Sequence, residues 1–328
     1  DLQLYHPWDL DIEQALSLAT ECEAAARGHD ARITNSEGAT LQSGMAVGVY
    51  GNTHGFVHGY PSSRHSLSCS VIAQQQDSMQ RDYWYTTARS PAALAQPAAV
   101  GERAAQRALA RLHGRKLKTR QAPVLFRAEV ATGLLNSLVQ AISGSALYRR
   151  ASFLLDALHS RIFPEWVNIE ENPHLLQGLS SAAFDAEGVA TRRKPLVSDG
   201  VLQSYVLGSY SARKLGMQTT GNAGGVRNLS IAMGGMGFDE LLREMGAGLV
   251  VTELKGQGVN RITGDYSRGA SGFWVEHGEI QYPVEEITIA GNLREMYRQL
   301  LAVGNDDDYP GSIRTGSWLI EAMMIAGE

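Results

Sequence analysis

The sequence contains little cysteine, little net charge and no long apolar run. Its 328 residues include only two cysteines, Cys22 and Cys69, too few for a disulfide framework or a four-thiolate zinc site. No run approaches the roughly 18 consecutive apolar residues of a membrane span, and residues 1–5 lack the basic and apolar regions of a signal peptide. We therefore expect a soluble, cytoplasmic protein that has no membrane partner.

The 29 basic and 34 acidic residues leave a formal net charge of −5, which argues against a nucleic-acid footprint over the whole chain. A hydrophobic content of 44% excludes intrinsic disorder. Glycine is abundant, with 35 residues and no collagen-like triplet, and predicts tight turns and glycine-punctuated strands. The length predicts two domains. Because Asp1 is not preceded by methionine, we expect that a segment was removed or that the sequence begins partway into a longer chain.

The N-terminal third predicts two helices around an antiparallel meander. Helical spacing of apolar residues, with Asp11 as a cap, predicts a helix over residues 11–28, in which Cys22 is a small core residue. Residues 45–50, 55–60 and 66–73 alternate or run apolar between Gly-Asn and Pro-Ser-Ser turns and predict strands. A second helix follows near 98–113. The basic connector 114–121 indicates domains at 1–119 and 120–328.

The C-terminal part predicts an α+β domain rich in short strands. An apolar strand at 123–126 precedes a helix near 128–142, and shorter helices are expected near 209–215, 239–245 and 292–301. Asp199-Gly200 and His277-Gly278 each separate two strand-like runs and predict hairpins. Residues 318–326 predict a buried closing strand. Asp306–Asp308 are expected to form a solvated loop.

Three histidines are candidate metal ligands. His54 and His58 have the spacing H-x-x-x-H, and His65 lies nearby in the sequence. A zinc-binding helix is contradicted by the flanking glycines and by the absence of a glutamate after His54. We interpret the first two as half-exposed histidines of a strand and keep a metal site as the alternative.

A basic stripe is a candidate binding surface. Arg103, Arg107 and Arg111 follow at every fourth residue, and four further basic residues continue the run: Arg115, Lys116, Lys118 and Arg120. The stripe lacks interleaved aromatic residues, which single-stranded nucleic acid would need for stacking. We interpret it as a solvated helix face or an inter-subunit surface, with nucleic-acid binding as the alternative.

Several long strings resemble a known family. They include TGNAGGV at 220–226, LVVTELKGQGV at 249–259 and TGDYSRGASGFWVE at 263–276, and the last is continued through 278–293. The chain resembles the TldD/PmbA family of bacterial metalloproteases, in its PmbA (TldE) branch, nearly from end to end. The resemblance implies an α+β fold of two domains: an antiparallel sheet with flanking helices, then a strand-rich, barrel-like C-terminal domain with short helices. It also implies that Asp1 is an internal position and that an upstream segment of the N-terminal domain is absent.

The resemblance further implies that this chain lacks the family's metal site. TldD-like subunits carry H-E-x-x-x-H at the start of the helix after an apolar strand, and a cysteine near the C-terminus. Here Arg127 and Thr132 stand in the two histidine positions and Ala128 in the glutamate position, while Glu129 is displaced by one residue, about 100° around the helix. Arginine has no lone pair to donate and threonine is a poor zinc ligand. Alanine cannot activate water. No cysteine follows Cys69.

We therefore expect a subunit of a TldD–TldE-like metallopeptidase that degrades or processes small or unfolded peptides. A zinc-type metal is expected on a TldD-like partner, and this chain is expected to support assembly and peptide binding. Asp265, Tyr266 and Arg268 are the candidate peptide- or partner-binding residues, and no catalytic residue or metal ligand is assigned. Two alternatives stay open: a peptidase in its own right, or a module that binds nucleic acid or a partner. Alone, the chain could also form a homodimer.

Overall fold

The computed structural model, which describes residues 1–328, divides into two compact units. Unit 1 consists of Asp1–Gly114 with Leu175–Ser181, and unit 2 consists of Arg115–His174 with Ala182–Glu328. None of the helices is both long and apolar enough to span a bilayer.

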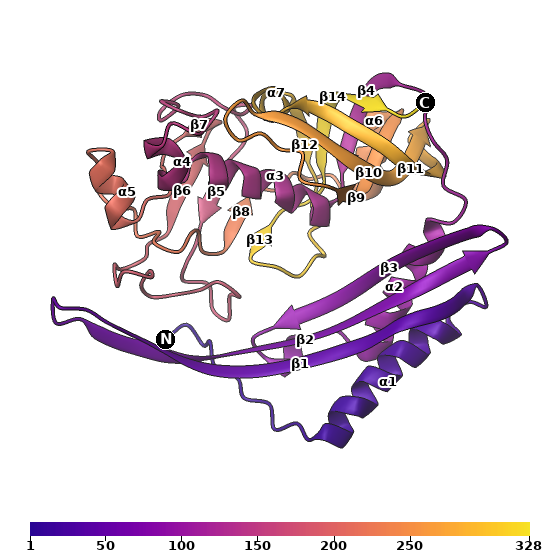
Figure 1. Cartoon of the computed structure of the whole chain (residues 1–328), viewed down its shortest axis with the longest axis horizontal. Helices are drawn as coiled ribbons and strands as arrows, with labels where there is room; N and C mark the ends of the chain where they lie inside the picture. The colour runs from indigo at the N-terminus through magenta and orange to yellow at the C-terminus, as the bar shows by residue number, and fades with distance from the viewer. The chain divides into compact units, whose positions relative to one another are not determined.

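Unit 1 is a three-stranded antiparallel sheet with two helices packed on it (Figure 1). Its strands, in the order β1-β2-β3, are β1 (Ile33–Gly51), β2 (Val57–Gln75) and β3 (Ser78–Ala88). The helices are α1 (Ile12–Gly28) and α2 (Pro97–Ala110), and a 3-10 turn, η1 (Pro91–Ala93), precedes α2. Alternate residues of β2 pack against alanines of α2 and against Cys22 and Ala26 of α1. Cys22 is fully buried, which confirms its prediction as a core residue.

The β1–β2 hairpin continues well past the end of β3 (Figure 1). The two strands pair as far as Gly51 and Val57, whereas β3 pairs with β2 only from His65 onward. We call this extension, residues 44–64, the arm. The predicted Pro-Ser-Ser turn is wrong, because Pro61 lies within β2 opposite Val47. Proline is tolerated there because β3 does not reach this part of β2, so no strand on that side requires an N–H from Pro61.

A closed barrel forms the centre of unit 2. The order β11-β10-β9-β4-β14, together with pairing between β11 and β14, closes a ring of five strands, and β12 (Leu300–Val303) extends it from β14. The ring consists of β4 (Arg120–Phe126), β9 (Gly248–Lys255), β10 (Asp265–Glu276), β11 (Glu279–Asn292) and β14 (Trp318–Ala326). The predicted hairpin at His277-Gly278 is confirmed by the pairing of Glu276 with Glu279.

A second sheet and short helices complete unit 2. The sheet has the order β13-β8-β5-β6-β7, with β13 (Ile313–Arg314), β8 (Leu229–Ile231), β5 (Ile169–Glu171), β6 (Lys194–Ser198) and β7 (Val201–Leu202). The helices are α3 (Ala128–Ala141), α4 (Gly144–Tyr148), α5 (Ser209–Lys214), α6 (Phe238–Met245) and α7 (Leu293–Arg298). Along β4, Val124 and Phe126 face the larger core cluster, which includes α3, while Leu125 faces α6. The predicted fold class is confirmed.

Candidate functional site

The end of β4 brings Arg127 to the N-terminus of α3, where it forms the cap residue. Its guanidinium lies 4.1 Å from the ring centre of Phe238. Arg127 Nε is 3.8 Å from Glu129 Oε2, and Nη1 is 3.7 Å from Asp306 Oδ2. The three charged side chains are only 11–15% exposed. We call this group the Arg127 cluster: an organic cation between two carboxylates.

The remaining motif positions are occupied by groups that do not fit a metal. Ala128 is fully buried, and the Thr132 hydroxyl donates a hydrogen bond of 2.7 Å to the Glu129 carbonyl. Nowhere in the chain do three or more His, Cys, Asp or Glu side chains group in a way that could hold a metal ion. The donor set at this position therefore consists of a permanent cation, a methyl group and a hydroxyl that is already hydrogen bonded.

Asp306 corrects the expectation of a fully solvated acidic loop. Its side chain is 13% exposed and accepts hydrogen bonds from Ser317 N at 2.7 Å and from Ser317 Oγ at 2.6 Å. The neighbouring Arg127 guanidinium offsets the cost of removing this carboxylate from water. Asp307 pairs with Arg314.

The candidate binding residues of β10 lie on opposite faces of the strand. Asp265 is exposed, and hydrogen bonds from Thr263 and Asn292 hold its pKa below the ordinary value. Tyr266 is 3% exposed, packs against Phe126, and has its pKa raised by burial to about 12. Arg268 follows two residues later and therefore shares the face of Tyr266. Both Tyr266 Oη and Arg268 Nε are buried without a hydrogen-bond partner.

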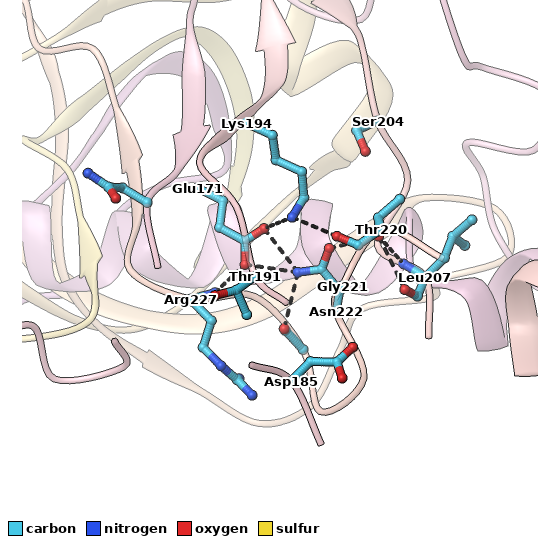
Figure 2. Close-up of polar contacts among 12 residues, drawn as sticks. Glu171, Asp185, Thr191, Lys194, Ser204, Leu207, Thr220, Gly221, Asn222 and Arg227 are labelled. Carbon is cyan, nitrogen blue, oxygen red and sulfur yellow. Dashed lines mark hydrogen bonds and ion pairs between the residues drawn. The ribbon is translucent and has the colours of Figure 1, made fainter. Parts of the chain in front are cut away.

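A second polar cluster, which the sequence did not reveal, surrounds Glu171 at the end of β5 (Figure 2). Glu171 is 1% exposed. Its carboxylate lies 2.6 Å from Lys194 Nζ and accepts hydrogen bonds from Asn222 Nδ2 at 2.8 and 2.9 Å and from Arg227 N at 2.6 Å. Both oxygens are thus fully used. We call these residues the Glu171 network.

The Glu171 network holds the loop 220–226. Lys194 Nζ donates to the Thr220 carbonyl at 3.0 Å, and Asp185 accepts from Ala223 N at 2.9 Å. Gly221 has φ +71°, and a Cβ there would lie 2.9 Å from the Ala190 carbonyl oxygen. The TGNAGGV string was visible in the sequence, but the partner carboxylate lies 51 residues from Asn222. Because every group is paired, the network fixes the loop and leaves no free base.

The three candidate histidines do not converge. His65 is fully buried, and its ring nitrogens lie 2.9 Å from Ser43 Oγ and 2.9 Å from the His6 carbonyl oxygen. His54 lies in the turn between β1 and β2, outside the strand expected for it. His58 is exposed on β2 and stacks on Phe56. Both nitrogens of His65 are therefore engaged, and no second ligand stands beside it.

The basic stripe of α2 is not a solvated face. Asp82 of β3 pairs with Arg107 at 3.1 Å and with Arg111 at 3.3 Å. Arg103 and Arg107 also lie over the ring of Trp84, at 4.9 and 5.1 Å from its centre. The solvated interpretation is wrong for these three arginines, because β3 presents a buried carboxylate and an indole to them, whereas the four further basic residues of the stripe are exposed: Arg115, Lys116, Lys118 and Arg120. The guanidiniums of the first three residues bind the helix to the sheet.

Two family models match nearly the whole chain. The central-domain model of the PmbA/TldA metallopeptidases matches residues 5–112, and their C-terminal-domain model matches residues 119–327.

Individual relatives agree with this match. The chain is 54% identical to Metalloprotease PmbA of Escherichia coli O157:H7, over 100% of this chain and 73% of that protein. It is 27% identical to a Metalloprotease TldD homolog of Haemophilus influenzae, over 39% of this chain and 29% of that protein.

Solved structures share the fold. A Bacteroides thetaiotaomicron protein solved as a candidate modulator of DNA gyrase superposes with a TM-score of 0.94 and 29% identity, covering 100% of this chain and 75% of that one. TldE from Thermococcus kodakarensis has a TM-score of 0.83 at 21% identity, covering 97% of this chain and 75% of that one. The similar proteins thus include both TldD and TldE.

Proposed function

Because the chain belongs to the PmbA branch of the PmbA/TldA metallopeptidase family, we propose that it is a supporting subunit of a heteromeric metallopeptidase in the cytoplasm. In this proposal a TldD-like partner holds the catalytic metal and the water-activating glutamate. The observation that carries the proposal is the Arg127 cluster.

The charges of the cluster argue against a metal in this chain. A divalent cation needs ligands with lone pairs, and Arg127 has none. The nearby carboxylates of Glu129 and Asp306 already face the Arg127 guanidinium. A metal ion would therefore have to displace a permanent positive charge to reach them. No step of hydrolysis is assigned to this chain.

The chain's own contribution would be to hold an extended peptide and to complete the assembly. Strand addition suits small or unfolded peptides, because backbone hydrogen bonds give affinity with little dependence on sequence. Asp265, Tyr266 and Arg268 are the proposed binding residues, and they would contact the peptide through their side chains, because β10 pairs with both β9 and β11 and has no free edge for strand addition. Asp265 offers an exposed acceptor, whereas the unpartnered atoms of Tyr266 and Arg268 lie inside and would be reached only if this part of β10 opened.

Peptide hydrolysis by this chain alone, by a TldD-like partner alone and by their mixture tests the proposal, with bound metal quantified in each sample. We expect turnover in the mixture only, and metal on the partner only. A metal-depleted partner is the control, and its mixture should be inactive until metal is restored. Stoichiometric metal and turnover in this chain alone would overturn the proposal.

A further inference from the structure

Two short helices of unit 2, α4 and α5, carry a group of exposed cations. The helices lie side by side (Figure 1), and they approach so closely at Gly144 that a Cβ there would collide with Ser211. Four exposed basic side chains lie at the end of α5 and directly after α4: Arg149, Arg150, Arg213 and Lys214. We call these four residues, together with Tyr148 and Tyr210, the α4–α5 patch.

The α4–α5 patch has no acidic partner. None of its four cations forms an ion pair with an Asp or Glu side chain. The two stretches that contain the patch, residues 130–155 and 200–238, include no Asp or Glu at all. Glu187 contacts the opposite end of α5, where it accepts a hydrogen bond of 2.7 Å from Ser209 N. In a chain whose formal net charge is −5, the patch is therefore a local concentration of positive charge.

The two tyrosines of the patch hold its cations in place. Their rings meet edge to face, with the ring centres of Tyr148 and Tyr210 5.7 Å apart. The Arg149 guanidinium lies 5.4 Å from the centre of the Tyr148 ring, and its Nε donates to Tyr148 Oη at 3.1 Å. Lys214 Nζ lies 5.7 Å from the centre of the Tyr210 ring. Cation–π contacts position a charge without neutralising it, so these groups keep donors for an anion.

Arg150 occupies a backbone conformation that disfavours arginine. Its φ is +57°, directly after α4, and Ala151 N closes the turn by donating to the Ala146 carbonyl at 2.8 Å. Glycine is the usual residue at such a helix end, because a side chain there costs conformational energy. The Arg150 guanidinium forms no hydrogen bond or ion pair within the chain. It is therefore available to an external anion.

We propose that the α4–α5 patch binds an acidic segment of an extended peptide, so that peptides containing Glu or Asp are held on this chain. Guanidinium groups bind carboxylates through paired, charge-assisted hydrogen bonds, and a lysine ammonium adds a further donor. The inference names the class of peptide for the proposed function and rests on that function.

The structure favours a peptide over a nucleic acid as the partner. Bases stack on open faces of aromatic rings, but Arg149 and Lys214 already lie over the rings of the two tyrosines. A nucleic acid also extends its phosphates beyond two short helices, and the remainder of a chain with a net charge of −5 would repel them. A short acidic segment stays within the patch.

Peptide binding by this chain without a partner tests the inference. The probe is a short fluorescein-labelled peptide of alternating Glu and Gly, and the matched probe replaces every Glu with Gln. Fluorescence anisotropy should show the Glu peptide binding at least about tenfold more tightly than the Gln peptide. Added salt should remove this difference, because it screens exposed charges.

Two variants assign the binding to the patch. Arg150→Gly removes a cation where glycine suits the backbone, so the fold should be preserved, and Lys214→Gln removes a cation from α5. We expect each to weaken binding of the Glu peptide by about fivefold. Lys118→Gln, at an exposed cation just before β4, and Gln76→Gly, at a φ of +53°, are the matched controls and should bind like the wild type.

Hydrolysis by the mixture with a TldD-like partner separates this inference from the proposed function. Arg150→Gly should raise KM for the Glu peptide and leave kcat and the hydrolysis of the Gln peptide unchanged. Binding of the Glu peptide without hydrolysis in any mixture would contradict the proposed function while supporting the patch.

Three results would overturn the inference. The first is equal binding of the Glu and Gln peptides. The second is unchanged binding by both Arg150→Gly and Lys214→Gln. The third is binding of oligothymidylate more tightly than the Glu peptide, lost in Lys214→Gln, which would make the patch a nucleic-acid site.

Discussion

Unit 2 buries polar groups in two different ways. In the Glu171 network every oxygen of a 1% exposed carboxylate is used at 2.6–2.9 Å. In the Arg127 cluster the ion pairs are 3.7 and 3.8 Å long. Tyr266 Oη, which belongs to a ring packed on Phe126, has no hydrogen-bond partner.

The Glu171 network therefore has the contacts of a structural element, whereas the Arg127 cluster and Tyr266 leave possible hydrogen bonds unformed. A saturated buried ion pair resists change because removing one partner strands the other in a medium of low polarity. The ion pairs of the Arg127 cluster, at 3.7 and 3.8 Å, are too long for hydrogen bonds, so each contributes less and can rearrange at lower cost. The Glu171 network is therefore assigned to holding loop 220–226, whereas the buried polar atoms without a hydrogen-bond partner include Tyr266 Oη and Arg268 Nε of β10.

The largest effect is expected for Glu171→Gln. The change leaves the Lys194 ammonium without its counter-charge and should lower the free energy of unfolding by about 3–5 kcal/mol, measured by denaturant titration. Glu170→Gln is the matched control, because Glu170 pairs with Arg193 at the surface, with side chains 36% and 66% exposed, and should change little.

The double variant Glu171→Gln with Lys194→Met sharpens this test. It removes the stranded charge, so it should recover part of the lost stability. If Glu171→Gln were no more destabilising than Glu170→Gln, the network would not be the structural element inferred here.

Patterns of adjacent residues predicted many of the strands and turns. The features that depend on pairing between distant strands could not be predicted in this way. The closing strand 318–326 and the turns at Asp199-Gly200 and His277-Gly278 were readable because a few adjacent residues determine them. The continuation of β2 through Pro61 could not be predicted from the sequence, because it depends on where β3 ends.

The candidate sites show the same division. The resemblance to the family predicted that Arg127 replaces a metal-ligating histidine. It did not predict the contacts of Arg127 with Asp306 and Phe238, because these residues come from segments that are far apart in the sequence. The Glu171–Lys194 pair was missed for that reason. The arginine stripe was misjudged because its partners Asp82 and Trp84 come from another element.

A smaller effect is expected at high pH from Tyr266. Its pKa is about 12 in the folded chain and about 10 when unfolded, so the unfolded state loses its proton first. Stability should therefore fall as pH rises from 10 to 12, and this residue accounts for about 2 kcal/mol of the loss at pH 12.

Tyr266→Phe should remove that part of the alkaline decline while leaving stability at pH 7 little changed, as followed by urea unfolding at each pH. Tyr5→Phe, at a ring 45% exposed, is the control and should leave the decline intact. Identical alkaline slopes for Tyr266→Phe and the wild type would contradict the assignment of a hydroxyl whose pKa is raised by burial.

The smallest effect is expected for Arg127→Gln, about 1 kcal/mol, because the change removes one contact with the Phe238 ring and two long ion pairs. Asp306 keeps its two hydrogen bonds from Ser317, so this carboxylate retains partners, whereas Lys194 loses its counter-charge in Glu171→Gln. In thermal unfolding, the Tm of this variant should be close to that of Arg161→Gln, which removes an exposed, 3.9 Å ion pair with Glu165. A loss as large as that of Glu171→Gln would erase the distinction between the two regions.

If the variant folds as expected, its effect on hydrolysis by the mixture with a TldD-like partner becomes informative, because a fall in turnover without a fall in stability would assign the Arg127 cluster to the working of the assembly.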